Sequence, residues 1–468
     1  MLLRSVIRER DDGLLDALIV GVRAVDPVDG IIGLRNVGVE QGTIAYIGKG
    51  EPHHKSRVDG EGLTLVPGFV DIHSHEDPVD PALEVRWDSA CHYALMGATT
   101  VIGGNCGTGR DVPSFLRRVD SHGAPCNQGM LVPHGSLREV AGAVDRYGPA
   151  TPAQIGRIKR MVAEGMNAGA FGVSFGLEYT PGATTDEAIE VARAAADYGG
   201  SLLAAHYRYD CERAVEAVEE LVNIGRETGL PFQVSHINSC AAFGNMAETL
   251  GVLESARASG VDVMADCYPY DAFCTFLGSA VFDPGCLERW GVGYDSLLLA
   301  GGPHAGTRAT AETFEYTRRN HPDSLVVAFV MRHDEVIQAL RHPLVMVGSD
   351  GLMRDGRGHP RTSGAFPRVI GRFVREGLLD FLDALRKMTV IPARRLGLEK
   401  KGRLVEGADA DLVLFDPATM NDMATYESPG LPPAGIRMVM VLGEVVCLDG
   451  RLTGSMPGRA VRRITTTG

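Results

Sequence analysis

The sequence of 468 residues lacks several features that mark whole classes of protein. No uninterrupted apolar stretch approaches the roughly 18 residues of a membrane-spanning helix, so we expect no membrane partner. No basic cluster is present and the formal net charge is -13, so we expect no nucleic-acid partner. The first residues reach charged Arg8, Glu9 and Arg10 before the apolar core of a signal peptide could form, which favours a cytoplasmic location.

The nine cysteines also lack a regular spacing, and their number is odd. This argues against a disulfide framework and fits reduced thiols. Hydrophobic residues make up 44% of the chain and charged residues 22%, values ordinary for a globular protein. The length is sufficient for a large core, and an α/β barrel of more than about 250 residues can form one unit.

Both ends of the chain contain short β segments separated by turn residues. They lie between residues 15 and 65, and again between 403 and 448. Each end alone has too few strands to bury a face. We therefore predict one small β-sandwich domain built from residues 1–65 and 403–468.

The middle of the chain alternates short apolar runs with helical patterns, which indicates βα units and a parallel sheet. Eight runs predict a (β/α)8 TIM-like barrel over residues 66–402, with an insertion at about 275–340 that contains the run SLVVAFVM. Between them, Thr184 and Glu187 match a capping box that opens a helix closing at Gly199 and Gly200. The eight runs are 68–75, 98–105, 129–135, 170–177, 202–208, 232–238, 261–268 and 344–350.

Residues at the ends of these runs are metal-ligand types. In a (β/α)8 barrel the strand ends carry the active site. Side chains alternate along a strand, so two histidines spaced by two residues point to the same side and can share a metal. By the same alternation, we expect Arg208 to point to the same side as His206, and Asn238 to the same side as His236. The candidate ligands are His73, His75, Cys106, His206, His236 and Asp350.

Each of these residues has an ordinary structural explanation when it is taken alone. A single histidine is more often a hydrogen-bonded core residue, a cysteine a small hydrophobe, and an aspartate after a strand a helix cap. Six such residues after five strands favour a metal centre. The stretch GGNCGTG could instead be read as a phosphate loop, but no P-loop lysine follows it.

Several segments in this order resemble the amidohydrolase superfamily and, within it, the N-acyl-D-amino-acid deacylases (D-aminoacylases). They are GFVDIHSHED, GNCG, GLEYTPG, AAHYRYD, VSHIN, DCYPY and GSDG with HPRTSGAFPR, and the likeness extends to the C-terminal PARRLGL and KGRLVEGADADLVLFDP. The resemblance implies a zinc-dependent amide hydrolase that converts a small-molecule N-acyl-D-amino acid into a carboxylate and a free D-amino acid.

The resemblance also implies a ligand set. Cys106, whose thiolate is a strong zinc ligand, would hold one tight zinc together with His206 and His236. His73, His75 and Asp350 would form a second, weaker site.

Catalytic and substrate-binding roles follow from the same resemblance. Asp350 would accept a proton from water and deliver it to the departing amine. Tyr179 and Tyr270 would stabilise the oxyanion, and Arg361 would bind the substrate carboxylate. His359 is expected to organise its loop rather than to bind metal.

One departure from the family bears on the substrate. Where the family commonly reads S-H-H-K, this chain has Ser235, His236, Ile237 and Asn238, so an amide replaces a lysine expected to face the substrate. Two alternative functions therefore stay open. One is hydrolysis of another linear or cyclic amide at the same metal site, and the other is a metal-free binding or scaffold role. The sequence leaves open the preferred side chain, the acyl group, whether one or two metal ions are bound and the oligomeric state, and D selectivity rests on the resemblance alone.

Overall fold

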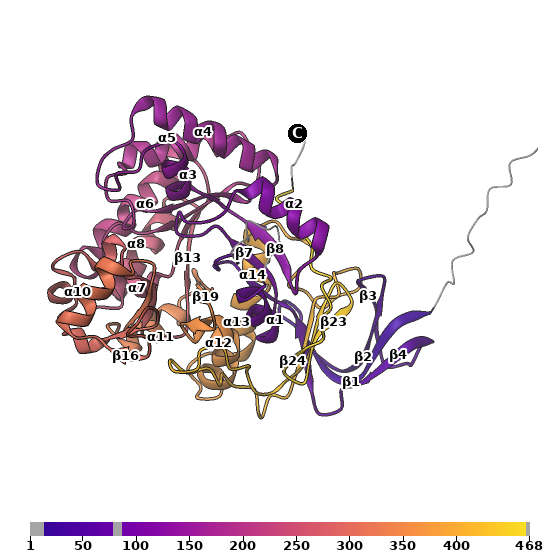
Figure 1. The fold of residues 1–468 in the computed structure, drawn as a ribbon. Coiled ribbons are helices and arrows are strands. Elements are labelled where there is room, and N and C mark those ends of the chain that lie inside the picture. The colour runs from indigo at the N-terminus through magenta and orange to yellow at the C-terminus, as the bar shows by residue number, and fades with distance from the viewer. Residues whose placement is uncertain (1–13, 78–86, 465–468) are drawn as a thin grey trace, which may run out of the picture.

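Figure 1 shows the computed structural model, which describes residues 14–77 and 87–464. Strands from both ends of the described chain lie together at one side of the molecule, and the helix-rich part lies at the other. The large hydrophobic core belongs to the helix-rich part, and a smaller core lies within the sheet formed by the chain ends.

The sheet of the chain ends has nine strands in the order β24-β23-β22-β21-β5-β1-β2-β3, with β4 paired to β1. Its two halves meet where β21 pairs antiparallel with β5, with Leu412 opposite Pro67. Apolar side chains such as Ile19, Val37 and Met440 pack on one of its faces. The boundaries of the domain and its two-layer arrangement stay predictions. The strands are β1 (Leu15–Asp26), β2 (Gly30–Glu40), β3 (Thr43–Gly48), β4 (His54–Asp59), β5 (Thr64–Pro67), β21 (Leu412–Phe415), β22 (Ile436–Val441), β23 (Glu444–Leu448) and β24 (Arg451–Leu452).

Each of the eight apolar runs contains a strand. The third run contains two, β8 and β9, which are separated only by Leu131. Every residue in these strands except Met264 is buried, as expected for a parallel sheet covered on both faces. The strands are β6 (Phe69–Asp71), β7 (Ala98–Gly103), β8 (Asn127–Met130), β9 (Val132–Pro133), β10 (Gly172–Gly176), β11 (Leu202–His206), β12 (Phe232–Val234), β13 (Val263–Cys267) and β18 (Val345–Val347).

These strands pair in two parallel sheets, β6-β7-β8 and β9-β10-β11-β12-β13-β18. The break between β8 and β9 is bridged by the Phe171 amide, just before β10, which donates to the Met130 carbonyl of β8 at 2.9 Å. At the other end, Ser74 forms a parallel bridge with Gly351, and the Asp350 amide donates to the His73 carbonyl at 2.7 Å. The loops that follow these strands therefore gather at one edge.

Helices separate the parallel strands, and Figure 1 shows α4, α5, α6 and α8 in succession beside them. The helix α5 begins after Thr184, whose hydroxyl accepts from the Glu187 amide at 3.1 Å, as predicted. It ends at Ala196, before the predicted glycines, and the Glu187 side chain turns inward to a buried Arg138 instead of completing a capping box. Among the described residues, no helix combines the length and apolar character needed to cross a bilayer. The helices are α1 (Ser89–Leu95), α2 (Val112–His122), α3 (His134–Val140), α4 (Pro152–Asn167), α5 (Thr185–Ala196), α6 (Ala214–Thr228), α7 (Ile237–Ala241), α8 (Met246–Ala258), α11 (His333–Arg341), α12 (Arg361–Arg368), α13 (Phe381–Met388) and α14 (Val390–Arg395).

The segment between β13 and β18 forms a separate antiparallel sheet in the order β14-β17-β15-β16. The run SLVVAFVM supplies its strand β17. Its elements are β14 (Phe273–Phe276), α9 (Cys286–Trp290), β15 (Leu297–Leu299), β16 (Thr307–Arg308), α10 (Ala311–Asn320) and β17 (Leu325–Ala328).

Candidate metal centre

The six predicted ligands converge beyond the ends of the parallel strands. They form two groups that share one thiol, and within each group the ligand atoms lie within 4.8 Å of one another. The first group contains Cys106, His206 and His236; the second contains His73, His75, Cys106 and Asp350.

The spacing of the donor atoms fits a metal ion. The Cys106 Sγ lies 3.3 Å from the His236 Nε2, which lies 3.0 Å from the His206 Nδ1. In the second group, the His75 Nε2 lies 3.1 Å from an Asp350 carboxylate oxygen. Ligand atoms at tetrahedral zinc, about 2.0–2.3 Å from the ion, stand roughly 3.3–3.7 Å apart. A thiolate with imidazoles is a donor set that suits zinc, so these residues fit the expected metal.

Three of the ligands occupy left-handed backbone conformations, which residues other than glycine rarely adopt. The φ angles are 56° for Cys106, 34° for His236 and 49° for Asp350. Each residue follows shortly after a strand, and this conformation turns the chain sharply there. Beside the cysteine, a Cβ added to Gly107 would lie 2.6 Å from the Gly176 amide nitrogen, so a larger residue does not fit.

A buried carboxylate that the sequence analysis missed orients one histidine. The Asp266 Oδ1 lies 3.0 Å from the His73 Nδ1 and accepts a hydrogen bond from the His236 amide at 2.8 Å. Its other oxygen accepts from the Gln233 side chain at 3.0 Å. Ligand histidines usually donate their second ring nitrogen in this way, which leaves the other nitrogen to the metal. The signal was present, because Asp266 lies at the end of the seventh run, in DCYPY.

Glu178 orients His206 in the same way, and the sequence analysis did not identify it either. Its Oε2 lies 2.8 Å from the His206 Nε2, which leaves Nδ1 facing the other ligands. The third imidazole is held by Ser239, whose hydroxyl lies 2.8 Å from the His236 Nδ1. Glu178 lies within the GLEYTPG segment, but only the fold brings it to the histidine.

The buried charges stabilise one another. Burial raises the pKa of the Cys106 thiol, but His73 and His236 outweigh it and hold that pKa well below its usual value. Burial likewise opposes ionisation of Asp350, but Arg361 and His73 keep its pKa well below the ordinary range. The environment therefore favours the ionised forms of both acids, which are the forms that bind metals.

Arg361 lies beside the candidate ligands. Its Nη2 is 2.8 Å from the Asp350 Oδ2 and donates to the Cys274 carbonyl at 3.1 Å. Its Nε and Nη1 are buried and have no partner within the described structure. His359 accepts from the Arg361 amide at 3.0 Å, and its Nε2 lies 3.0 Å from the Ala272 carbonyl, so it organises this loop.

The two tyrosines expected at the carbonyl differ in position. The Tyr179 hydroxyl lies 3.0 Å from the Thr275 hydroxyl, and its ring lies 4.4 Å from the His206 ring. The Tyr270 hydroxyl instead donates to Asp422 at 3.2 Å, so the geometry does not favour its predicted role.

Tyr268, which the sequence analysis did not select, is better placed. The Arg361 guanidinium stacks 4.4 Å from the centre of its ring. Its hydroxyl is buried and has no hydrogen-bond partner in the described part of the chain. The DCYPY segment contains both tyrosines, and sequence alone does not distinguish which of them faces the ligands.

The two remaining substrate-binding candidates do not line the pocket beside the ligands. The Arg208 guanidinium binds Glu220, at 2.7 and 2.9 Å, because it leaves the strand end toward α6. Asn238 is fully buried in α7 and its amide nitrogen lies 3.4 Å from the carbonyl oxygens of Tyr268 and Tyr270. The strand β12 ends at Val234, so strand parity does not extend to this residue.

One pocket opens beside the ligand groups. Its lining comes from the strand-end loops and from the inserted segment. The lining residues are Glu178, Tyr179, His206, Tyr207, Asp210, His236, Ser239, Phe273, Cys274, Thr275, Val281 and Asp350.

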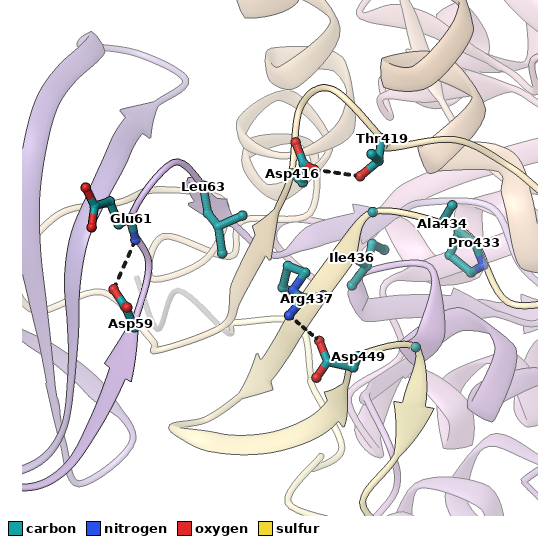
Figure 2. A pocket seen from close by; sticks show the side chains of 12 residues that line it. Asp59, Glu61, Leu63, Asp416, Thr419, Pro433, Ala434, Ile436, Arg437 and Asp449 are labelled. Atoms are coloured by element: carbon teal, nitrogen blue, oxygen red, sulfur yellow. Dashed lines mark hydrogen bonds and ion pairs between the residues drawn. The ribbon is translucent and has the colours of Figure 1, made fainter.

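Figure 2 shows a second, more open hollow on the sheet of the chain ends. Asp59, Asp416 and an Arg437–Asp449 ion pair at 3.0 Å lie in its wall, and neither histidine nor cysteine is among its lining residues. The candidate site is therefore the pocket at the strand ends.

The chain resembles known proteins over most of its length. The model of the Amidohydrolase family matches residues 57–338 and 328–447. The D-aminoacylase of Alcaligenes xylosoxydans xylosoxydans is 34% identical, over 97% of this chain and 99% of that protein.

Two solved structures extend the likeness to the whole fold. A D-aminoacylase whose binuclear metal centre is described as activated by one metal and attenuated by a second has a TM-score of 0.86 and 30% identity, over 96% of this chain and 100% of that one. The N-acyl-D-glutamate deacylase of Bordetella bronchiseptica, complexed with zinc and a phosphonate that mimics the tetrahedral intermediate, has a TM-score of 0.85 and 33% identity, over 96% and 99%. The chain thus belongs to the amidohydrolase family, in the group that contains the D-aminoacylases and N-acyl-D-glutamate deacylases.

Proposed function

We propose that the protein is a zinc-dependent amide hydrolase that converts N-acyl-D-amino acids into a carboxylate and a free D-amino acid. The observation that carries the proposal is the position of Arg361, whose two unpaired N–H groups lie beside two ligand groups that share Cys106. The activities named for the similar proteins support the same reaction and its D selectivity.

We assign one tightly held zinc to Cys106, His206 and His236, and a second, weaker site to His73, His75 and Asp350. The binuclear centre described for a D-aminoacylase supports two positions. When bound, zinc would polarise the amide carbonyl and lower the pKa of water.

Asp350 is suited to moving the proton. One of its oxygens lies 3.1 Å from the His75 Nε2 and 3.4 Å from the His73 Nε2, and the other is held by Arg361 at 2.8 Å. This fixed carboxylate would accept a proton from water and then deliver it to the departing amine.

Arg361 would bind the α-carboxylate of the substrate. A guanidinium recognises a carboxylate through its charge and its N–H donors, and either Nη1 or Nε, which point to opposite sides of the group, is free to donate to it. Leaving buried donors without partners costs free energy, which a substrate carboxylate would offset. Tyr179 and Tyr268 would donate to the developing oxyanion, and we propose Tyr268 in place of Tyr270.

We further propose that the two parallel sheets form one (β/α)8 barrel. The Phe171–Met130 hydrogen bond and the Ser74–Gly351 bridge support closure at both breaks in the pairing. The residues 66–402 would form this barrel, the two chain ends the small β-sandwich, and the segment at about 275–340 the insertion over its mouth.

The test is hydrolysis by the purified, zinc-loaded protein of N-acetyl-D-leucine against a hydantoin and a dihydropyrimidine. We expect amine release from the acyl amino acid and no ring opening. Turnover of the cyclic amides alone would favour the alternative function on the same metal site.

A further inference from the structure

The pocket beside the ligands has walls of different chemical character. His206, His236 and Asp350 form the end at which the amide would react. Phe273 and Val281, from the segment between β13 and β18, form another part of the wall, together with the small side chains Cys274 and Thr275. A substrate held by its carboxylate on Arg361 and by its carbonyl at the metal ligands would direct its side chain toward this part of the wall.

The pocket is lined by carboxylates and by no lysine or arginine within the described chain. The lining carboxylates are Glu178, Asp210 and Asp350. An acidic side chain would therefore meet groups of its own charge.

Arg289 is the cation that could offset this charge, but its own partners neutralise it. Its Nε lies 2.6 Å from the Asp210 Oδ1, and an Nη atom lies 3.5 Å from Glu178. The neighbouring Trp290 indole donates to the second Asp210 oxygen at 2.7 Å, which fixes the carboxylate in place. The Asp210 side chain is 4% exposed and the Arg289 side chain 35%, so the carboxylate end of this ion pair is buried.

The other arginine that contacts the lining is Arg361. Its unpaired N–H groups can bind one carboxylate, and under the proposed function this is the α-carboxylate of the substrate. Among the described residues no cation is then left for a second carboxylate. Burying a charge without a partner is unfavourable, and nearby carboxylates increase the penalty.

We propose that the site selects N-acyl-D-amino acids with uncharged, mainly apolar side chains and rejects those of D-glutamate and D-aspartate, because Asp210 and Glu178 neutralise Arg289. This inference rests on the proposed deacylase function. Asp210 determines this specificity, because it is ion-paired with Arg289, the cation that an acidic side chain of the substrate would need.

The experiment compares kcat/KM of the zinc-loaded protein for N-acetyl-D-leucine, N-acetyl-D-methionine, N-acetyl-D-glutamate and N-acetyl-D-aspartate at pH 8. Burial raises the pKa of Asp210 to about 6, so the carboxylate is ionised under these conditions. We expect kcat/KM to be at least about 100-fold lower for the two acidic substrates. Values for D-glutamate or D-aspartate within about threefold of D-leucine would overturn the inference. Failure to hydrolyse any of the four substrates with zinc bound would instead overturn the proposed function, and this inference with it.

Two variants separate this explanation from a general loss of activity. Asp210→Asn keeps an acceptor for Trp290 but frees Arg289, so the ratio of kcat/KM for D-glutamate to that for D-leucine should rise about tenfold. Arg289→Met should leave that ratio low. Glu216→Gln, which removes a 58%-exposed partner of Arg213, is the matched control and should leave the ratio unchanged. A selective loss of D-glutamate hydrolysis in Arg289→Met would contradict the inference, because Arg289 would then be the receptor of the acidic side chain.

Discussion

The Cys106 Sγ lies 3.3 Å from the His236 Nε2. The same sulfur lies 3.3 Å from the His73 Nε2, so one thiolate belongs to both ligand groups. Loss of this sulfur should therefore affect both metal positions.

Cys106→Ser should bind less than about one zinc per chain and lose at least about 1000-fold in kcat/KM, because a hydroxyl is a much poorer zinc ligand than a thiolate. Metal analysis and amine release measure the two effects. The control is Cys91→Ser, in α1 and outside both ligand groups. Full zinc content in the Cys106 variant would contradict the assignment.

Asp266→Asn should weaken zinc binding by about 10–100-fold, because its carboxylate orients His73 and the His236 backbone. Competition with a chelator measures the zinc Kd, and activity at saturating zinc should recover in part. Asp262→Asn, at an ion pair on the surface, is the matched control. Equal zinc affinities in the two variants would show that Asp266 does not position the ligands.

Arg361→Met should lower kcat/KM for N-acetyl-D-leucine by about 100-fold, since the α-carboxylate loses its cationic hydrogen-bond partner. For the corresponding N-acetyl-D-leucine amide, which lacks that carboxylate, kcat/KM should differ far less between the wild type and the variant. Arg208→Met should leave kcat/KM for both substrates near the wild-type values, because Arg208 is bound to Glu220. Equal losses on the acid and the amide would mean that Arg361 acts only through Asp350.

Tyr268→Phe should lower kcat by about 10–100-fold with little change in KM, if its free hydroxyl stabilises the oxyanion. Tyr270→Phe should cost less than about threefold, because its hydroxyl is bound to Asp422. Steady-state kinetics of the two variants decide between these residues. The reverse order of effects would restore the role that the sequence suggested for Tyr270.

Glu187 should make stability depend on acid pH. Burial raises its pKa, but hydrogen bonds from His134 and Arg138 lower it from 4.5 to about 2. Because this pKa is lower in the folded than in the unfolded state, the ionised Glu187 stabilises the folded protein above pH 4.5. This stabilisation is lost as the pH falls toward 2. Glu187→Gln should therefore lower the free energy of unfolding by about 3 kcal/mol at pH 7. The difference in this free energy between wild type and variant should narrow below pH 4.5.

Urea unfolding of both proteins at several pH values measures that gap. The control is Glu190→Gln on the same helix, whose side chain is 46% exposed. A gap that stays constant or widens in acid would contradict the buried ion pair.

The parallel strands and the ligands were predictable because each residue gives its own local signal. Apolar runs locate the strands, and ligand types mark their ends, so the six ligands converge as expected. Strand parity did not place Arg208 and Asn238 in the pocket. Both lie beyond the ends of β11 and β12, Asn238 in α7, where the direction of a side chain no longer depends on the strand.

The groups around the ligands were not predictable in this way. Asp266 and Glu178 support histidines 193 and 28 residues away in the chain, and no local pattern records such a pairing. Tyr268 and Tyr270 are two residues apart in a loop, and only tertiary packing directs one hydroxyl to Asp422. Part of the pocket lining comes from the segment between β13 and β18, and the sequence indicated the sheet of this segment only through the run in β17.

The most direct test of the proposed function is amine release from matched N-acetyl-D- and N-acetyl-L-amino acids, with zinc, after chelation and after zinc is restored. We predict hydrolysis of the D series alone, its loss on chelation and its recovery with zinc. Hydrolysis that persists without metal, or silence on the D series with zinc bound, would contradict the account.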